Sequence, residues 1–365
     1  MNKTRLNIAI LAAMSLFLGS CGPEVPTTPV NVYEKGVFLM NEGAFSGGSG
    51  TVTHYNPDSS KVRQNIFETE NARPLGNVGQ SMAVIGENTY LVANGANKIE
   101  IVDAKFKSVG IINAAQIAQP RYILGINAST AYVSQWGSDG ISGKVLVVDL
   151  ATKQVTKSIE TGSGSEQMVR VGNLVFVVNA GGFGVDSTVA VIDVTTNSLT
   201  QKIVVGKQPN SILVDKAGTT IWVLCGGTQD FMNPANDTKG SIWRINAATA
   251  AVIDHQDMPT NTFHPAKMVL GNEFSAVYFL SNYYGGEVFS CTQNPLQIST
   301  SPVVPGSFLV IGIDPVRNNQ RNLYAAKGSF TSNGTAYKYT ITSASAATKT
   351  DSFAVGLIPT YFLFK

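Results

Sequence analysis

Residues that commonly carry out catalysis are scattered through this sequence rather than grouped. The three histidines, His54, His255 and His264, stand far apart, and no HxH or CxxC pair accompanies them. Because zinc sites need closely spaced His and Cys ligands, no metal site is expected. The sequence also lacks a GxSxG elbow and a phosphate-binding loop. The chain is therefore expected to bind rather than to catalyse, with no catalytic residues and no cofactor.

Aromatic residues, in contrast, recur in a pattern that suits ligand binding. They stand in short segments that also contain glycine or small polar residues, and they are Phe45, Trp136, Phe183, Phe231, Tyr283, Tyr284 and Phe330. Glycine lets a loop turn freely, and rigid aromatic rings offer a large, partly apolar contact surface. The alternative is that these rings pack between neighbouring structural units and stiffen the loops.

Polar residues near the same segments are candidates to hydrogen-bond amide or phosphate groups of a ligand. Those expected to precede or begin inner strands are Arg73, Gln80, Arg121, Glu166, Gln167, Asn210, His264 and Lys267. Those inside the aromatic-bearing loops are Asn41, Glu42, Asn179, Asp230 and Asn282. The alternative for each is a solvated surface residue.

The elements that position these residues form an internal repeat. Six segments share one plan of four short strands, in which a glycine-rich loop separates the second strand from the third. One copy contains Pro209–Leu213, Ile221–Leu224 and Ser241–Asn246, and Ser307–Val310 is expected to open the last copy. The copies start roughly 41 to 56 residues apart, which is the length of a propeller blade.

The two ends of the chain complete a seventh unit. Near the N-terminus, Gly36–Asn41, Gly50–Tyr55 and Lys61–Phe67 match the second, third and fourth strands of a blade, and Pro359–Phe364 supplies the missing first strand. The sequence therefore predicts an all-β, seven-bladed β-propeller over residues 35–365. Its blades are four-stranded and antiparallel, and the ring is closed by pairing of the C-terminal strand with the N-terminal blade.

Composition limits the classes of partner. Charged residues make up 14% of the chain and the net charge is +2, without a basic cluster, so nucleic acid is not an expected partner.

Cys225 and Cys291 lie in apolar strand patterns and are expected to be buried, with a disulfide between them left open. Asp149 and Asp193 end strands and are expected to cap tight turns. The protein is expected to be a monomer.

The first residues have the pattern of a processing signal. Lys3 and Arg5 precede an apolar run, Ile8–Leu18, that is too short to span a bilayer. The following Leu18–Cys21 resembles a bacterial lipobox, which implies a signal peptide over residues 1–20 and a lipidated Cys21. Residues 21–34 are rich in proline and are expected to form an extended tether. By resemblance to lipoprotein sorting rules, the expected location is the outer membrane, on its periplasmic face or at the cell surface.

Two segments carry a family resemblance. Lys144–Ile159 and Val189–Gly206, the latter followed by Lys207–Leu213, are similar to the VxVIDxxTxxVxxxIxVGxxP unit of YVTN, or YncE-like, bacterial propellers. Together with the lipobox, the opening segment Gly36–Pro57 resembles lipoproteins that include cobalamin-binding surface propellers. This resemblance implies that the protein captures a corrinoid at the channel mouth for a TonB-dependent outer-membrane transporter.

Two other functions stay open at the level of sequence. The propeller face can serve as an envelope platform that binds proteins or glycans. A hydrolase of the lactonase type is the third reading, because Glu42, Glu166 and Asn179 supply part of the residue set that propeller lactonases use.

Overall fold

The computed structural model describes residues 31–44, 48–271, 275–315 and 317–365. Residues 32–365 form one compact unit. The predicted signal peptide, the lipidated Cys21, most of the tether and the predicted ligand contact Phe45 lie outside the described residues. Within the described residues, no helix is long and apolar enough to cross a bilayer.

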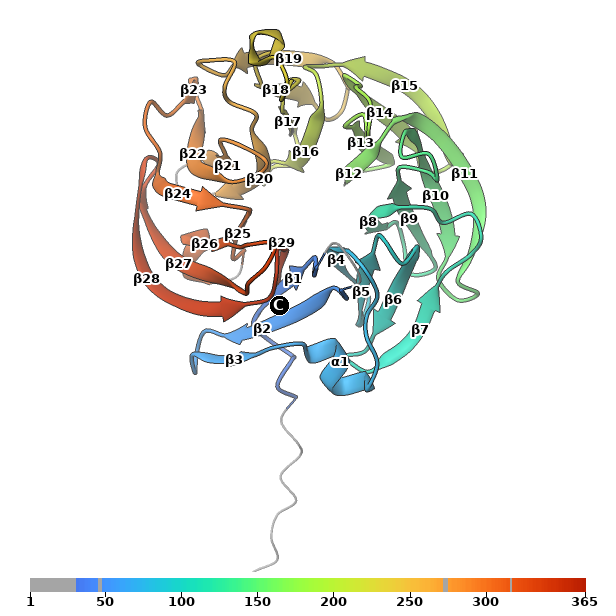
Figure 1. Cartoon of the computed structure of the whole chain (residues 1–365). Coiled ribbons are helices and arrows are strands. Elements are labelled where there is room, and N and C mark those ends of the chain that lie inside the picture. The colour runs from blue at the N-terminus through green and yellow to red at the C-terminus, as the bar shows by residue number, and fades with distance from the viewer. Residues whose placement is uncertain (1–30, 45–47, 272–274, 316) are drawn as a thin grey trace, which may run out of the picture. The chain divides into compact units, whose positions relative to one another are not determined.

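Seven antiparallel sheets surround a central axis, as Figure 1 shows, and each first strand lies innermost. From the innermost strand outward, the first three sheets are β29 (Pro359–Phe364), β1 (Val37–Asn41), β2 (Thr51–Asn56) and β3 (Lys61–Arg63); β4 (Gly79–Ile85), β5 (Asn88–Ala93), β6 (Lys98–Val102) and β7 (Ser108–Ile112); and β8 (Pro120–Gly125), β9 (Thr130–Gln135), β10 (Ser142–Asp149) and β11 (Gln154–Ser163). The next two are β12 (Ser165–Val171), β13 (Leu174–Asn179), β14 (Thr188–Asp193) and β15 (Ser198–Val204); and β16 (Pro209–Val214), β17 (Thr220–Cys225), β18 (Ser241–Asn246) and β19 (Val252–Asp257). The last two are β20 (Ala266–Gly271), β21 (Ala276–Leu280), β22 (Gly286–Gln293) and β23 (Leu296–Ile298); and β25 (Val310–Ile313), β26 (Asn322–Lys327), β27 (Gly334–Ser343) and β28 (Ala346–Val355). The prediction of a seven-bladed, all-β propeller is confirmed.

The ring closes as predicted. β29, from the C-terminus, pairs antiparallel with β1, so that Val37 faces Phe364 and Leu39 faces Phe362. Figure 1 shows this red strand beside the blue strand of the N-terminal sheet. Backbone hydrogen bonds between Gly36 and Lys365, both 3.0 Å long, extend the pairing to the last residue.

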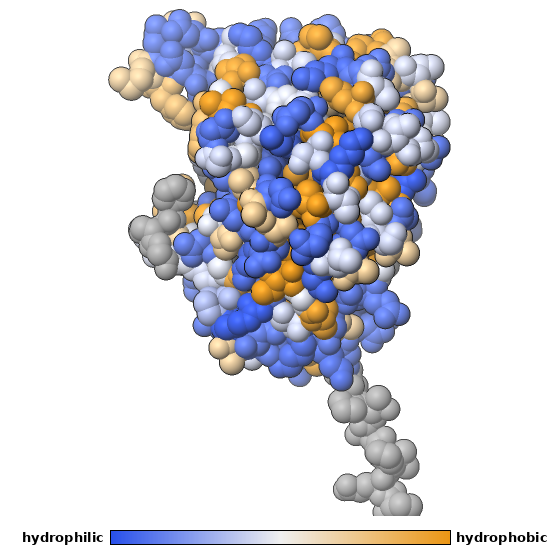
Figure 2. All heavy atoms as spheres, turned by 90° about the vertical axis from the view of Figure 1, so that its right-hand side faces the viewer, coloured by the Kyte–Doolittle hydropathy of each residue, from blue (hydrophilic) through white to orange (hydrophobic). Residues whose placement is uncertain are grey.

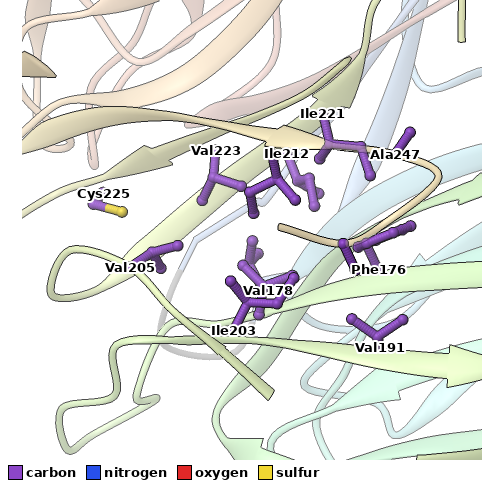
Figure 3. Packing of buried hydrophobic residues seen from close by; sticks show 13 residues of the cluster. Phe176, Val178, Val191, Ile203, Val205, Ile212, Ile221, Val223, Cys225 and Ala247 are labelled. Carbon is purple, nitrogen blue, oxygen red and sulfur yellow. The ribbon is translucent and has the colours of Figure 1, made fainter. Parts of the chain in front are cut away.

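The core consists of apolar layers between neighbouring blades. Figure 3 shows one layer, in which Val178, Val191 and Ile203 from one blade pack against residues of the next. The middle strands are buried on both faces because each sheet has a neighbour on either side, and β13 is buried almost throughout. The outermost strands are polar, as in β15, and Figure 2 shows hydrophilic and hydrophobic residues interspersed on the outer flank.

Two predicted strands differ in the structure. Of Lys61–Phe67, only Lys61–Arg63 forms β3; the chain then turns at Asn65 (φ 52°) and forms the helix α1 (Ile66–Asn71). The helix buries Ile66 and Phe67, each 1% exposed, and an outermost strand could not bury this adjacent pair on one face.

The expected strand Ser307–Val310 is divided between two elements. β24 (Val304–Phe308) pairs with β22 of the preceding sheet, and β25 begins at Val310. Phe308 is buried in the layer between the two blades. The chain crosses from one sheet to the next directly after it, because the Leu309 N–H already donates to the Ala326 carbonyl of the next sheet, at 2.9 Å. Two short 3₁₀ turns, η1 (Pro234–Asn236) and η2 (Asn318–Gln320), lie in loops.

The smaller predictions about turns and thiols hold. The Asp149 carboxylate accepts the Thr152 N–H at 2.7 Å, and Asp193 accepts the Thr195 N–H at 2.7 Å. Cys225 and Cys291 are both buried and both free, so no disulfide joins them.

Candidate ligand-binding site

A β-bulge near the start of the first strand recurs in six blades. In β8, for example, Pro120 pairs with Gln135 and Tyr122 with Ser134, which leaves Arg121 outside the ladder. A bulge re-aims the side chain that it leaves unpaired. The first residue left outside the ladder is polar in each of these bulges, and we call the six the bulge ring: Gln80, Arg121, Glu166, Asn210, Lys267 and Thr360.

A buried ion pair lies in the bulge ring. The Nε of Arg121 donates to Oε1 of Glu166 at 2.7 Å, and the two residues are 8% and 5% exposed. The guanidinium also lies over the Trp136 ring, 4.1 Å from its centroid. Burial raises the pKa of the Glu166 carboxyl, and the Coulombic attraction of Arg121 and Lys267 opposes this rise. The pair therefore fixes the Arg121 side chain between two blades.

Lys267 brings a second positive charge into the ring. Its backbone is left-handed (φ 58°), a conformation that is costly for a side chain of this size. Its Nζ donates to the Thr360 carbonyl at 3.3 Å and lies 5.8 Å from the centroid of the Tyr283 ring. Burial lowers the pKa of Lys267 to about 8.

Four residues of the bulge ring, Arg121, Glu166, Asn210 and Lys267, line a cavity of about 300 Å³ at the channel mouth. Its lining comprises Arg121, Tyr122, Trp136, Glu166, Ala180, Gly182, Phe183, Gln208, Asn210, Ser211, Gly226, Gly227, Gln229, Phe231, His264, Ala266, Lys267, Tyr283 and Tyr284. We call the buried part of this lining, with Arg121 and Glu166, the floor, and the exposed aromatic part, with Phe183, Phe231 and Tyr284, the rim. A cavity with this division suits a ligand that has both polar groups and a large apolar surface.

The rim of the cavity exposes aromatic rings. Phe183, Phe231 and Tyr284 are 74%, 68% and 64% exposed. Phe183 meets Trp136 edge to face at 5.6 Å, and Phe231 meets Tyr284 at 5.8 Å. Gly140 (φ 72°) lies against Phe183, and a Cβ there would clash with that ring. The rings are held by neighbours yet leave much of their area open to a ligand.

The long loop 226–240 is fixed beside the cavity by His264. One ring nitrogen of His264 lies 3.1 Å from the Gly226 carbonyl and the other lies 3.2 Å from the Asp237 carboxylate. Inside the loop, Asp230 accepts the N–H groups of Met232 and Asn233, both at 3.0 Å. The loop that carries Phe231 is thus braced at both ends.

The structure brings together most of the predicted contacts. The mouth cavity is lined by Arg121, Trp136, Glu166, Phe183, Asn210, Phe231, His264, Tyr283 and Tyr284, and also by Lys267. Phe330 is 70% exposed and does not line this cavity, because its blade lies elsewhere on the ring. Gln167 accepts the Ile212 N–H at 3.1 Å and lines a second cavity.

Several other candidates have structural roles. Arg73 forms a two-pronged ion pair with Glu100, with bonds of 2.6 and 3.2 Å, away from the cavity. Asn41 and Asn179 are buried and hydrogen-bonded within their own sheets. Gln80 is buried in its bulge, and Asn282 accepts the Tyr284 N–H at 3.1 Å.

Glu42 lies near the ring without lining the cavity, and burial raises its pKa. Asn179 is buried and hydrogen-bonded within its own sheet, so it is not available to join Glu42 and Glu166 in a lactonase-like set. Within the described parts of the chain, no three His, Cys, Asp or Glu residues are grouped as a metal site would require.

Sequence reasoning missed Tyr122, Gln208 and Gln229, which also line the mouth cavity. A usable signal exists for Tyr122. All six bulges contain a proline, glycine or small residue followed by a polar one, as in Pro120-Arg121, Pro209-Asn210 and Pro359-Thr360, and in four of them the next residue returns to the ladder.

A second cavity, of about 350 Å³, shares Tyr122 and Lys267 with the first. Its other walls are mainly aliphatic and aromatic, from β20, β25 and β29. Tyr122 and Tyr361, whose ring centroids are 6.2 Å apart, lie along it. The channel thus changes from polar at the bulge ring to apolar beyond it.

Comparison with known proteins agrees with this architecture. The model of the family described as "Domain of unknown function (DUF5074)" matches residues 35–294. No curated protein matches the chain.

Solved structures share the fold at low sequence identity. A candidate 6-phosphogluconolactonase from Bacteroides uniformis is 12% identical, with a TM-score of 0.67 over 91% of this chain and 100% of that one. A similarly described protein from Bacteroides fragilis is 12% identical, with a TM-score of 0.64 over 92% and 99%. The periplasmic gluconolactonase of Pseudomonas aeruginosa is 11% identical, with a TM-score of 0.63 over 90% and 99%. At these identities the likeness establishes the propeller fold alone.

Proposed function

The chain belongs to the DUF5074 family, and we propose that it is a binding protein that captures a large, partly apolar small molecule at the channel mouth. The observation that carries this proposal is the cavity of about 300 Å³, whose exposed aromatic rim surrounds a floor of charged and amide groups. Aromatic rings supply contact area at low entropic cost, and the polar floor supplies specificity.

The ligand that we propose is a corrinoid. A corrinoid combines a flat ring system with peripheral amides, and its nucleotide form also carries a phosphate. Phe183, Phe231 and Tyr284 would contact the flat part, while the amides of Gln208 and Gln229, which also line the cavity, would contact the polar part. The resemblance to cobalamin-binding surface propellers supports the same choice.

The proposal places the protein at the outer membrane as a lipid-anchored monomer that passes its ligand to a TonB-dependent transporter. Its support is the lipobox resemblance at Leu18–Cys21. Metabolic labelling with a radioactive fatty acid tests the anchor: label should enter the wild-type chain and not the variant Cys21→Ser.

Calorimetric titration of residues 32–365 with cobalamin and with its base-free precursor tests the site. We expect one-to-one binding that weakens roughly 30-fold or more in Trp136→Ala and in Phe183→Ala, the effect typical of an aromatic residue that a ligand covers. Phe330→Ala is the matched control, because this exposed ring lies outside the cavity. Absence of binding to the wild type would contradict the corrinoid proposal and favour a macromolecular partner for the exposed rim.

A second candidate is lactone hydrolysis, which the names of the similar structures suggest. The specific observation is that Glu166 and Lys267, two groups with shifted pKa values, share one cavity. Shifted titratable groups in a cleft are a mark of acid–base catalysis. Hydrolysis of 6-phosphogluconolactone above the spontaneous rate, lost in Glu166→Gln, would support this function; a rate equal to buffer would exclude it.

A further inference from the structure

The charges of the bulge ring do not pair one to one at contact distance. Glu166 neutralises Arg121 directly, with 2.7 Å between Nε and Oε1. Lys267 forms no ion pair with any described residue, and its one hydrogen bond goes to a neutral carbonyl, that of Thr360. Glu166 and, more weakly, Glu42 act on Lys267 only from beyond ion-pair distance, and burial raises the pKa of both carboxyls.

Arg121 also keeps donors for a ligand. A guanidinium has five N–H groups in a planar fork. Only Nε of Arg121 is hydrogen-bonded within the described residues, so both terminal nitrogens remain. The side chain is 10% exposed, lines the cavity and is held in place by Glu166 and the Trp136 ring. Its free donors are therefore prearranged rather than mobile.

Lys267 is half-buried, and a cation drawn out of water without a contact partner costs free energy unless something in the cavity compensates it. Lys267 adds backbone strain to this cost, because its φ of 58° is left-handed. Neither the unpaired charge nor the strained backbone of Lys267 adds hydrogen bonds to the sheet, because the bulge leaves Lys267 outside the ladder. Both features are explained if a negative group of a ligand sits between Lys267 and the free edge of Arg121.

We propose that Arg121 and Lys267 form a subsite for a single anionic group, a phosphate ester or a carboxylate, at the base of the mouth cavity. This inference deepens the proposed binding function and rests on it. The aromatic rim would hold the apolar body of the ligand while its anionic group reaches the bulge ring. Arginine and lysine bind phosphates and carboxylates through charge-assisted hydrogen bonds, which strengthen where water is excluded.

The test uses simple anions, so that its outcome does not depend on the identity of the natural ligand. The purified full chain is titrated with methyl phosphate and, in a separate arm, with acetate, at pH 7 and at pH 9.5. We expect a dissociation constant on the order of 1 mM for the preferred anion at pH 7. The arm that binds more tightly identifies phosphate or carboxylate as the group.

Variants locate the anion. Lys267→Met should weaken binding about tenfold or more, whereas Lys267→Arg, which keeps the charge, should retain it. Lys207→Met is the matched control, because Lys207 is exposed beside Gln208 on the same face. Thermal unfolding of each variant shows whether it is folded.

A pH effect provides an independent readout. The groups that face Lys267 are Glu166, Arg121, Glu42 and Tyr283, and burial places the pKa of Lys267 at about 8. Binding should therefore weaken from pH 7 to pH 9.5 as Lys267 loses its proton. It should weaken much less in Lys267→Arg, whose guanidinium stays charged.

The outcomes separate the two proposals. Equal anion binding by wild type and folded Lys267→Met, or no saturable binding at ~10 mM of either anion, would overturn the subsite. Corrinoid binding without anion binding would refute the subsite and leave the capture function standing. Anion binding without corrinoid binding would support the subsite and refute that choice of ligand.

Discussion

Replacing Phe362 by alanine should open the seam that closes the ring. Phe362 is 7% exposed in β29, and its ring centroid lies 5.9 Å from Tyr324 and 6.0 Å from Phe364. Gly312 faces it from the neighbouring blade, where a Cβ would come within 2.7 Å of Phe362 Cβ. Because glycine has no side chain that can move into the space, the variant Phe362→Ala should leave a cavity.

A buried Phe→Ala change costs about 3–5 kcal/mol, and the rigid surroundings favour the upper part of that range. This is a large share of the ~5–15 kcal/mol by which a domain is stable. Guanidinium unfolding followed by tryptophan fluorescence measures the loss, and Phe330→Ala, which removes an exposed ring, should change the free energy of unfolding by less than ~0.5 kcal/mol. A loss in Phe362→Ala as small as that of the control would refute the argument that β29 closes the ring through this contact.

Three further predictions concern buried polar groups. Glu166→Gln should reduce the free energy of unfolding by about 3 kcal/mol because it leaves the Arg121 charge unpaired, and adding Arg121→Met should restore most of the loss in a denaturant titration. Burial lowers the pKa of His54, whose Nε2–H donates to the Lys35 carbonyl at 2.9 Å while Nδ1 has no hydrogen-bond partner among the described residues. The folded state thus favours neutral His54. Its contribution to stability is complete above pH ~6.5 and is lost as the pH falls through the lowered pKa. Unfolding measured at pH 8 and pH 5 should show a smaller acid loss in His54→Gln than in the wild type, and an equal loss would contradict this role. Burial raises the pKa of the Cys225 and Cys291 thiols to about 12, so iodoacetamide should label neither until the protein is unfolded, as mass spectrometry would show.

The fold was largely readable from the sequence because each blade repeats the same alternation of strands and turns. The predicted strands Ser241–Asn246 and Pro359–Phe364 have the observed bounds. The pattern failed where the chain leaves the repeat. The helix α1 is specified by a turn at Asn65 and by burial against other blades, and neither is visible in a strand pattern.

The candidate site was readable only in part. Glycine beside an aromatic residue identified the loops that carry Trp136 and Phe183, because the local backbone decides that pattern. Which loops share a cavity depends on their positions around the propeller, and for this reason the sequence pattern groups Phe330 with aromatic residues that it does not join in the cavity. The role of Lys267 depends on the register between β20 and β21, since a bulge there decides whether its side chain joins the ladder or the cavity.

The bulges also bear on how such a protein can diversify. Arg121, Glu166, Asn210 and Lys267 occupy positions that the strand ladders skip, so their side chains are not tied to the alternation that packs blade on blade. Exchange at these positions would change the groups that the channel mouth presents and would leave the ladder hydrogen bonds in place. A lineage, or an engineer, can thus vary selectivity at a handful of sites on an inherited frame, provided that charges which contact each other, such as those of Arg121 and Glu166, are exchanged together.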